Sequence, residues 1–179
     1  MEPQKILITG GVRSGKSRYA EHLMSIHPDV TYLAPGPVPD PVADPEWAAR
    51  ITAHQEARPS SWRTVETSRV PEALTSHEPP ILLDCLGTWL TAVVDGLGTW
   101  DLPLAQWQAS FDKHLDELVH AWLDVPGLAV AVTNEVGMGL VSEHRSGRVF
   151  TDLLGRTNQA LAAASDHVVL VVAGRALYL

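Results

Sequence analysis

The residues best suited to chemistry stand near the start of the chain, where eight of them fit the pattern G-x-x-x-x-G-K-[ST]. The apolar run Lys5–Thr9 precedes this pattern and a helical pattern follows it, which is the context of a phosphate-binding loop. In such a loop, backbone N–H groups surround a phosphate, and the next helix adds the positive end of its dipole. A glycine-rich turn that merely ends a strand is the alternative interpretation. The predicted nucleotide-binding residues are Gly10, Gly11, Val12, Arg13, Ser14, Gly15, Lys16 and Ser17.

Two side chains of this loop have predicted chemical roles. Lys16 provides a catalytic charge for the β and γ phosphates of a nucleoside triphosphate, and Ser17 provides a hydroxyl ligand for Mg²⁺. A second, acidic metal ligand normally ends a hydrophobic strand, and the run ILLD that ends at Asp84 has that form. Asp84 could instead cap the helix that follows. These features predict phosphoryl transfer, nucleotidyl transfer or a nucleotide-driven switch, and they do not name a substrate.

Alternating strand and helix patterns along the chain must position these residues. The alternation predicts an α/β fold, a three-layer P-loop NTPase (RecA-like) fold with a mostly parallel central sheet. At 179 residues the chain is the size of one nucleotide-binding domain, residues 1–179. The predicted strands are Lys5–Thr9, Val30–Ala34, Arg63–Glu66, Ile81–Cys85, Leu128–Thr133 and Val168–Val172. The predicted helices are Lys16–Ile26, Asp44–Ala57, Gly87–Leu97, an amphipathic segment from Leu104 to Trp122, and Phe150–Ser165.

The segment between the second and third strands has two unlike parts. Repeated proline over residues 35–41 predicts an irregular loop, since proline fits neither a helix interior nor a central strand. The predicted helix Asp44–Ala57 carries His54 on one face with Trp47 and Ile51. Taken alone, such a histidine is either packed, solvated or a nucleophile. Trp62, farther along, is more typical of a core residue than of a stacking platform.

Composition excludes several classes of protein. The net charge of −8, from 13 basic and 21 acidic residues, argues against nucleic acid as the main partner. Cys85 is the one cysteine, so no disulfide can form within the chain. No apolar run approaches the roughly 20 residues of a membrane span, and no secretory signal is evident. We therefore expect a cytoplasmic protein without a membrane span.

Several longer motifs carry a resemblance to a known family. They are an opening TGGxRSGKS, a central HxxxRPxxWxTxE over residues 54–66, a VTNEVGxG loop over 132–139, and GRxNQxLAxxxD over 155–166. Together with the acid-ended strand, they cover nearly the whole chain. The sequence thus resembles the bifunctional adenosylcobinamide kinase / adenosylcobinamide-phosphate guanylyltransferase family of cobalamin biosynthesis.

The resemblance implies two reactions and their substrates. In one, a hydroxyl of adenosylcobinamide attacks the γ phosphate of ATP or GTP. In the other, GTP loses pyrophosphate as GMP passes to a histidine, and adenosylcobinamide phosphate then takes the GMP to form adenosylcobinamide-GDP. The resemblance also implies Mg²⁺ as cofactor, and a homo-oligomer, with a trimer the expected form.

The same resemblance assigns roles to individual residues. It places the guanylylated, catalytic histidine on His54, whose neutral imidazole is a competent nucleophile at neutral pH. Arg58 suits bidentate contact with phosphate, although an arginine before proline can also simply end a helix. Where the family usually has a hydroxyl after the second strand, this chain has Pro35. The further nucleotide-binding positions are Ala34, Pro35, Gly36, Gln55, Glu56, Ala57, Arg58, Glu66 and Asp84.

Two other hypotheses remain open on the residues alone. One is a different small-molecule P-loop kinase that forms no covalent intermediate. The other is a nucleotide-dependent switch or assembly protein, in which His54 is a surface residue. Asn134 and Glu135, in a loop after a central strand, either support the active site or form a simple turn.

Overall fold

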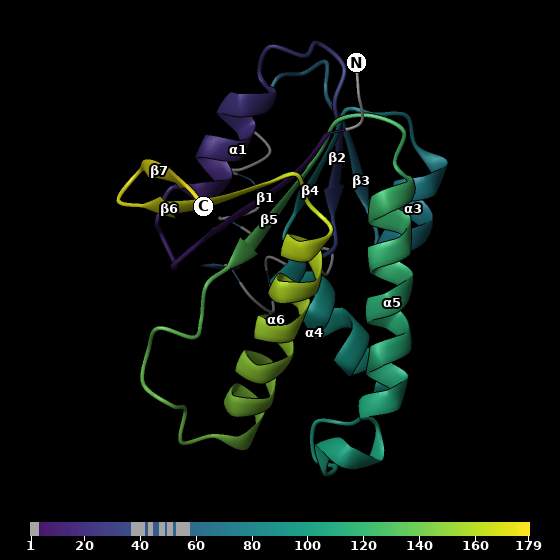
Figure 1. Cartoon of the computed structure of the whole chain (residues 1–179), viewed down its shortest axis with the longest axis vertical. Coiled ribbons are helices and arrows are strands. Elements are labelled where there is room, and N and C mark those ends of the chain that lie inside the picture. Colours follow the sequence, from purple (N-terminus) through teal and green to yellow (C-terminus); the bar gives the residue numbers. More distant parts are fainter. Residues whose placement is uncertain (1–3, 37–41, 43–44, 47–48, 50–51, 53–57) are drawn as a thin grey trace.

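A single mixed sheet runs through the computed structural model, which describes residues 4–36, 42, 45–46, 49, 52 and 58–179 (Figure 1). Within these residues the sheet has seven strands in the order β3-β2-β4-β5-β1-β6-β7. All neighbouring strands are parallel except β6 and β7, which pair antiparallel. The strands are β1 (Lys5–Gly10), β2 (Thr31–Ala34), β3 (Arg63–Glu66), β4 (Ile81–Asp84), β5 (Ala129–Asn134), β6 (His167–Val172) and β7 (Arg175–Tyr178).

Helices cover the two faces of this sheet and bury a separate core on each. On one face, α1 packs over Ile8, Leu82 and Val130. On the other, α3 to α6 pack over Leu7 and Leu83, the residues that alternate with them along the strands (Figure 1). The helices are α1 (Lys16–Met24), α3 (Val70–Ser76), α4 (Leu86–Leu97), α5 (Gln108–Asp124) and α6 (Arg145–Ala163), with a 3₁₀ turn at Leu104–Gln106. The predicted three-layer α/β architecture with a mostly parallel sheet is confirmed.

The buried strands lie within one or two residues of their predicted positions, because near-continuous aliphatic runs are typical of parallel strands covered on both faces. Other boundaries were wrong. The last helix begins at Arg145 rather than Phe150, and the amphipathic helix begins at Gln108, after the 3₁₀ turn, rather than at Leu104. The sequence predicted neither α3 nor β7. The predicted helix Asp44–Ala57 falls mostly outside the described residues.

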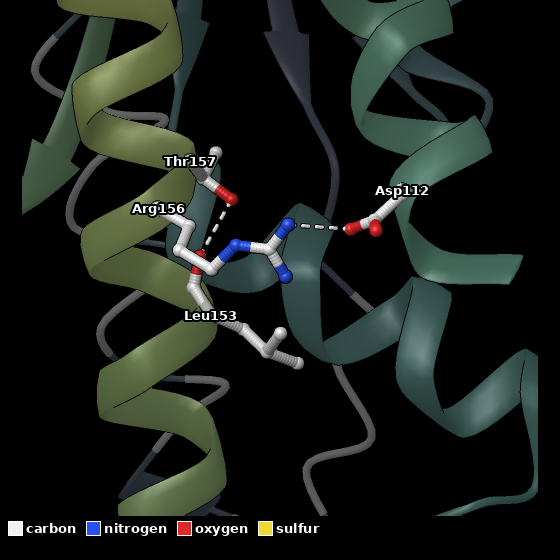
Figure 2. Close-up of polar contacts among 4 residues, drawn as sticks. All are labelled: Asp112, Leu153, Arg156 and Thr157. Atoms are coloured by element: carbon white, nitrogen blue, oxygen red, sulfur yellow. Dashed lines mark hydrogen bonds and ion pairs between the residues drawn. The ribbon is translucent and has the colours of Figure 1, made fainter. Parts of the chain in front are cut away.

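One ion pair ties α6 to α5, and a neighbouring polar side chain is paired within α6 (Figure 2). The Arg156 guanidinium on α6 donates to the Asp112 carboxylate on α5 at 2.6 Å. One residue on, the fully buried hydroxyl of Thr157 donates to the carbonyl oxygen of Leu153 at 2.9 Å. Both polar side chains of this stretch therefore have partners inside the protein.

The start of β1 is held in a similar way. The backbone N–H of Lys5 donates to the Asp166 carboxylate at 2.7 Å, and its ammonium group donates to the carbonyl of Val125 at 2.7 Å. Burial lowers the pKa of Lys5, and the charge of Asp166 opposes that shift. These contacts anchor the strand that leads into the predicted phosphate loop. In the part of the chain that the structure describes, no helix combines the length and hydropathy needed to cross a membrane.

Candidate active site

The predicted phosphate loop connects the end of β1 to the start of α1. Gly15 is the N-cap of α1 and has φ 94°, a left-handed conformation that glycine adopts without the steric penalty of a Cβ. Arg13 also has positive φ, at 58°. The turn is closed by a hydrogen bond from the N–H of Ser14 to the carbonyl of Gly11 at 3.2 Å. The geometry is that of a strand, a tight glycine loop and a helix N-terminus, which is a favourable place for an anion.

The turn between β6 and β7 packs against this loop. The N–H of Gly174 donates to the carbonyl of Ser14 at 2.7 Å. A Cβ on Gly10 would lie 2.5 Å from the carbonyl oxygen of Val171, and one on Gly15 would lie 3.3 Å from the Cα of Gly174. Close packing therefore requires glycine at position 10, and the positive φ together with a tight contact favours glycine at position 15.

The polar side chains of the loop fit a phosphate ligand. The side chain of Lys16 is mostly buried, and its ammonium group donates to the Gly11 carbonyl at 3.3 Å. The hydroxyl oxygens of Ser14 and Thr9 are buried and have no hydrogen-bond partner within the described residues. Buried hydroxyls normally have partners, which a bound ligand or water would supply here. Ser17 lies half-buried in the first turn of α1.

Asp84 lies at the carboxyl end of β4, and one strand, β5, separates β4 from β1. The capping alternative does not hold, because the N-cap of α4 is Cys85. The half-buried carboxylate of Asp84 instead accepts a hydrogen bond from the hydroxyl of Tyr32 at 3.0 Å. The peptide bond between Asp84 and Cys85 is cis.

The residues present fit a magnesium ion held mainly by nucleotide phosphates. Among the described residues, no group of three or more His, Cys, Asp or Glu side chains could hold a metal. Mg²⁺ in nucleotide sites typically uses one or two protein ligands, with phosphate oxygens and water completing its shell. One carboxylate, Asp84, and one hydroxyl, Ser17, match that requirement.

Arg58 lies next to Tyr32, the residue whose hydroxyl donates to Asp84. Its guanidinium carbon is 3.3 Å from the centroid of the Tyr32 ring, and it donates to the Thr64 hydroxyl at 3.3 Å. Burial, followed by the charge of Asp84, raises the pKa of Tyr32 well above its usual value. Tyr32 is thus a neutral hydrogen-bond donor at neutral pH. Sequence reasoning missed it; the available signal was a lone tyrosine in an aliphatic strand.

The other predicted positions have different outcomes. Ala34, Pro35 and Gly36 follow β2, and Glu66 ends β3; β4 and β5 lie between β2 and β1 in the sheet. The structure therefore puts these residues at the same edge of the sheet as the phosphate loop but not on neighbouring strands. His54, Gln55, Glu56 and Ala57 lie outside the described residues.

The loop after β5 contacts the phosphate loop directly. The N–H of Glu135 donates to the carbonyl of Gly10 at 3.0 Å, and the Glu135 carboxylate accepts from the N–H of Gly137 at 2.9 Å. Asn158 on α6 holds the end of β5: it accepts from the Thr133 hydroxyl at 2.6 Å and donates to the Asn134 carbonyl at 3.0 Å. The loop thus lies directly beside the phosphate loop, and its role in supporting the active site stays a prediction.

Comparison with known proteins agrees with this geometry. The family model for cobinamide kinase / cobinamide phosphate guanyltransferase matches residues 6–179. The chain belongs to this family. It is similar to the bifunctional adenosylcobalamin biosynthesis proteins CobU of Salmonella typhimurium (43% identity) and Escherichia coli (40%), each over 94% of this chain and 96% of the relative. It is also similar to the bifunctional adenosylcobalamin biosynthesis protein CobP of Pseudomonas aeruginosa, at 34% identity over 94% of this chain and 92% of the relative.

Membership of the cobinamide kinase / cobinamide phosphate guanyltransferase family confirms the predicted function class. The chain is a transferase of cobalamin biosynthesis, and the other two hypotheses, a kinase without a covalent step and a switch protein, do not describe this family. Nucleoside triphosphates are its expected phosphoryl and nucleotidyl donors.

Proposed function

We propose that this chain carries both activities of its family, phosphorylating adenosylcobinamide and then guanylylating the product through a histidine intermediate. The observation that carries the proposal is the loop between β1 and α1. There, closely packed glycines precede a mostly buried lysine, whose ammonium donates to Gly11, and the buried hydroxyl of Ser14 has no hydrogen-bond partner within the described residues. Relatives named as bifunctional enzymes, similar over 94% of the chain, support the pairing of the two activities.

In the kinase step, a substrate hydroxyl attacks the γ phosphorus of ATP or GTP, and the nucleoside diphosphate leaves. Lys16 neutralises charge on the β and γ phosphates, and the backbone from Gly10 to Gly15 orients them. Ser17 and Asp84 would hold Mg²⁺, which supplies further positive charge to the phosphate oxygens. Catalysis here consists of positioning and electrostatic stabilisation rather than covalent chemistry.

In the guanylyl step, an imidazole nitrogen of His54 attacks the α phosphorus of GTP, and pyrophosphate leaves. A phosphate oxygen of adenosylcobinamide phosphate then attacks the same phosphorus and releases the imidazole, giving adenosylcobinamide-GDP. Arg58 contributes positive charge to the phosphates from its place against Tyr32. The remaining predicted contacts to the guanine nucleotide are Ala34, Pro35, Gly36, Gln55, Glu56, Ala57 and Glu66.

We also propose that the protein works as a homo-oligomer, with a trimer as the expected form, in the cytoplasm. Exposed apolar side chains in the loop between β5 and α6 support a contact between copies: Met138, Leu140 and Val141 are 80%, 102% and 81% exposed. Four of the six tryptophans, Trp62, Trp89, Trp107 and Trp122, are buried and do not provide such a surface. Sedimentation analysis of the purified protein tests the oligomeric state.

The test of the covalent step uses GTP labelled at the α phosphate. We expect an acid-labile, base-stable adduct on the wild-type protein, no adduct on His54→Ala, and kinase activity in both. His120→Ala, on the exposed side of α5, is the matched control and should label normally. Label retained by His54→Ala would assign the nucleophile to another residue.

A further inference from the structure

Tyr32 stands between two charged groups to which the proposed function gives different tasks. It lies in β2 and is 2% exposed. Its hydroxyl is 3.0 Å from a carboxylate oxygen of Asp84 at the end of β4. Its ring lies 3.3 Å from the guanidinium carbon of Arg58, which comes from the segment before β3. One buried side chain thus contacts both a predicted metal ligand and the arginine four residues after His54.

The hydroxyl contact has one direction. An ionised carboxylate has no proton to donate, so the phenol donates and Asp84 accepts. A tyrosine phenol ordinarily titrates at a pKa of about 10, so it carries its proton at neutral pH. Asp84 is therefore oriented by a neutral donor, which adds no positive charge beside the carboxylate.

The ring contact fixes the second group. A guanidinium over an aromatic face is attracted by the ring electrons, and the attraction is larger where water is excluded. Here Arg58 is half-buried, and its Nε is buried without a hydrogen-bond partner in the described residues. Its hydrogen bond to the Thr64 hydroxyl limits rotation of the guanidinium in the plane of the ring contact. The flat ring of Tyr32 and the Thr64 hydroxyl together determine where the arginine's charge lies.

We propose that Tyr32 is a positioning residue for both reactions, with its hydroxyl orienting Asp84 and its ring orienting Arg58. The inference rests on the proposed roles of Asp84 and Arg58. Two substitutions distinguish the two contacts, because phenylalanine keeps the ring and loses the hydroxyl, whereas leucine loses both. A tyrosine that merely filled the core would change stability in these variants without changing their response to Mg²⁺ or their labelling by GTP.

The experiment compares Tyr32→Phe, Tyr32→Leu and wild type well below their melting temperatures. The first measurement is the affinity for a fluorescent, non-hydrolysable GTP analogue as the Mg²⁺ concentration is raised. For Tyr32→Phe we expect the half-saturating Mg²⁺ concentration to rise by about fivefold to tenfold, as for the loss of one hydrogen bond to a charged group. Binding without Mg²⁺ should not change. Tyr178→Phe, which removes a hydroxyl paired with Tyr19 at 2.8 Å, is the matched control and should behave as wild type.

The second measurement is the rate of labelling by α-labelled GTP at saturating Mg²⁺. Tyr32→Phe should label at close to the wild-type rate, because the ring under Arg58 remains. Tyr32→Leu should label several-fold more slowly, by about the worth of a partly buried cation–π contact, and added Mg²⁺ should not restore it. Equal labelling of the two variants would overturn the role assigned to the ring.

A third variant, Asp84→Asn, distinguishes failure of this inference from failure of the proposed function. If Asp84→Asn shifts the Mg²⁺ response and Tyr32→Phe does not, the orienting role of the hydroxyl is wrong while the metal site stands. If Asp84→Asn leaves the Mg²⁺ response unchanged, Asp84 is not a metal ligand, and the hydroxyl's role is overturned with it. Tyr32→Phe replaces one side chain by another of nearly the same shape, so a folding defect does not obscure either result.

Discussion

Two motif segments of this chain both carry the family resemblance, but their polar side chains have different surroundings in the structure. The phosphate loop, Gly10–Ser17, contains the buried hydroxyl of Ser14, which has no hydrogen-bond partner within the described residues. In the late motif, Gly155–Asp166, most of the polar side chains are paired inside the protein, and Gln159 is exposed. These pairs join Arg156 to Asp112, Thr157 to Leu153, Asn158 to Thr133 and Asp166 to Lys5.

This difference distinguishes residues that can bind a ligand from residues that hold the fold together, which the sequence motifs alone do not. Both segments contribute to the family resemblance, yet a polar group already paired within the fold has little left to offer a ligand. An orphaned buried group is costly unless a ligand or water completes it. We therefore expect variants of the polar side chains in the phosphate loop to lose activity with a smaller loss of stability, and variants of the paired side chains in the late motif to do the reverse.

The largest effect should come from Lys16→Ala. Removing its charge should lower kcat for the kinase step by at least about 100-fold, as for loss of one electrostatic contact to a transferred group. We expect the free energy of unfolding to change far less, in proportion, than the kinase activity does, although the Gly11 carbonyl loses its hydrogen bond from the ammonium group. Steady-state kinetics and urea denaturation measure the two quantities.

The matched control is Lys113→Ala, an exposed lysine on α5, which should change neither quantity. A near wild-type kcat in Lys16→Ala would mean that the phosphate loop does not contribute to phosphoryl transfer as proposed.

Asn158→Ala should have the opposite profile. It leaves the buried Thr133 hydroxyl and the Asn134 carbonyl without their partner, so the free energy of unfolding should fall by about 2 kcal/mol. The affinity for nucleotide should stay close to wild type, because Glu135 still bonds to Gly10. Urea denaturation and equilibrium nucleotide binding test the pair of expectations.

Its control is Gln159→Ala, the exposed neighbour on the same helix, which should leave stability unchanged. Loss of nucleotide binding by Asn158→Ala without loss of stability would contradict an architectural role for the late motif.

The same contrast explains how much of the fold the sequence could predict. Buried parallel strands were predicted because their aliphatic runs are a local signal. Two elements were missed: α3, which buries only Val70, Ala73 and Leu74, and β7, a mostly exposed edge strand. The start of α6 was missed because Gly147 weakens the helical pattern there. That turn is held by Arg145, which donates to the Trp100 carbonyl, a contact 45 residues away in the chain.

Within the candidate site, too, the sequence could predict groups that depend on neighbours in the chain but not groups that are brought together from distant segments. Lys16 and Ser17 could be predicted because the loop's chemistry depends on neighbours in sequence. The assembly of Tyr32, Arg58 and Asp84 could not, because it requires β2 to lie beside β4 in the sheet. The support of Gly15 by the turn at Gly174 likewise depends on the antiparallel return of β7.

The smallest effect should come from the ion pair between Arg156 and Asp112 (Figure 2). Their side chains are 40% and 38% exposed, so water and salt screen the attraction despite the 2.6 Å contact. A double-mutant cycle of Arg156→Ala and Asp112→Ala should give a coupling free energy of about 0.5 kcal/mol, falling further in 1 M salt. Nucleotide affinity should be the same in all four proteins. A drop in affinity confined to the Arg156 variants would mean that this arginine serves a ligand as well as the fold, and the division between the two motifs would then fail at this residue.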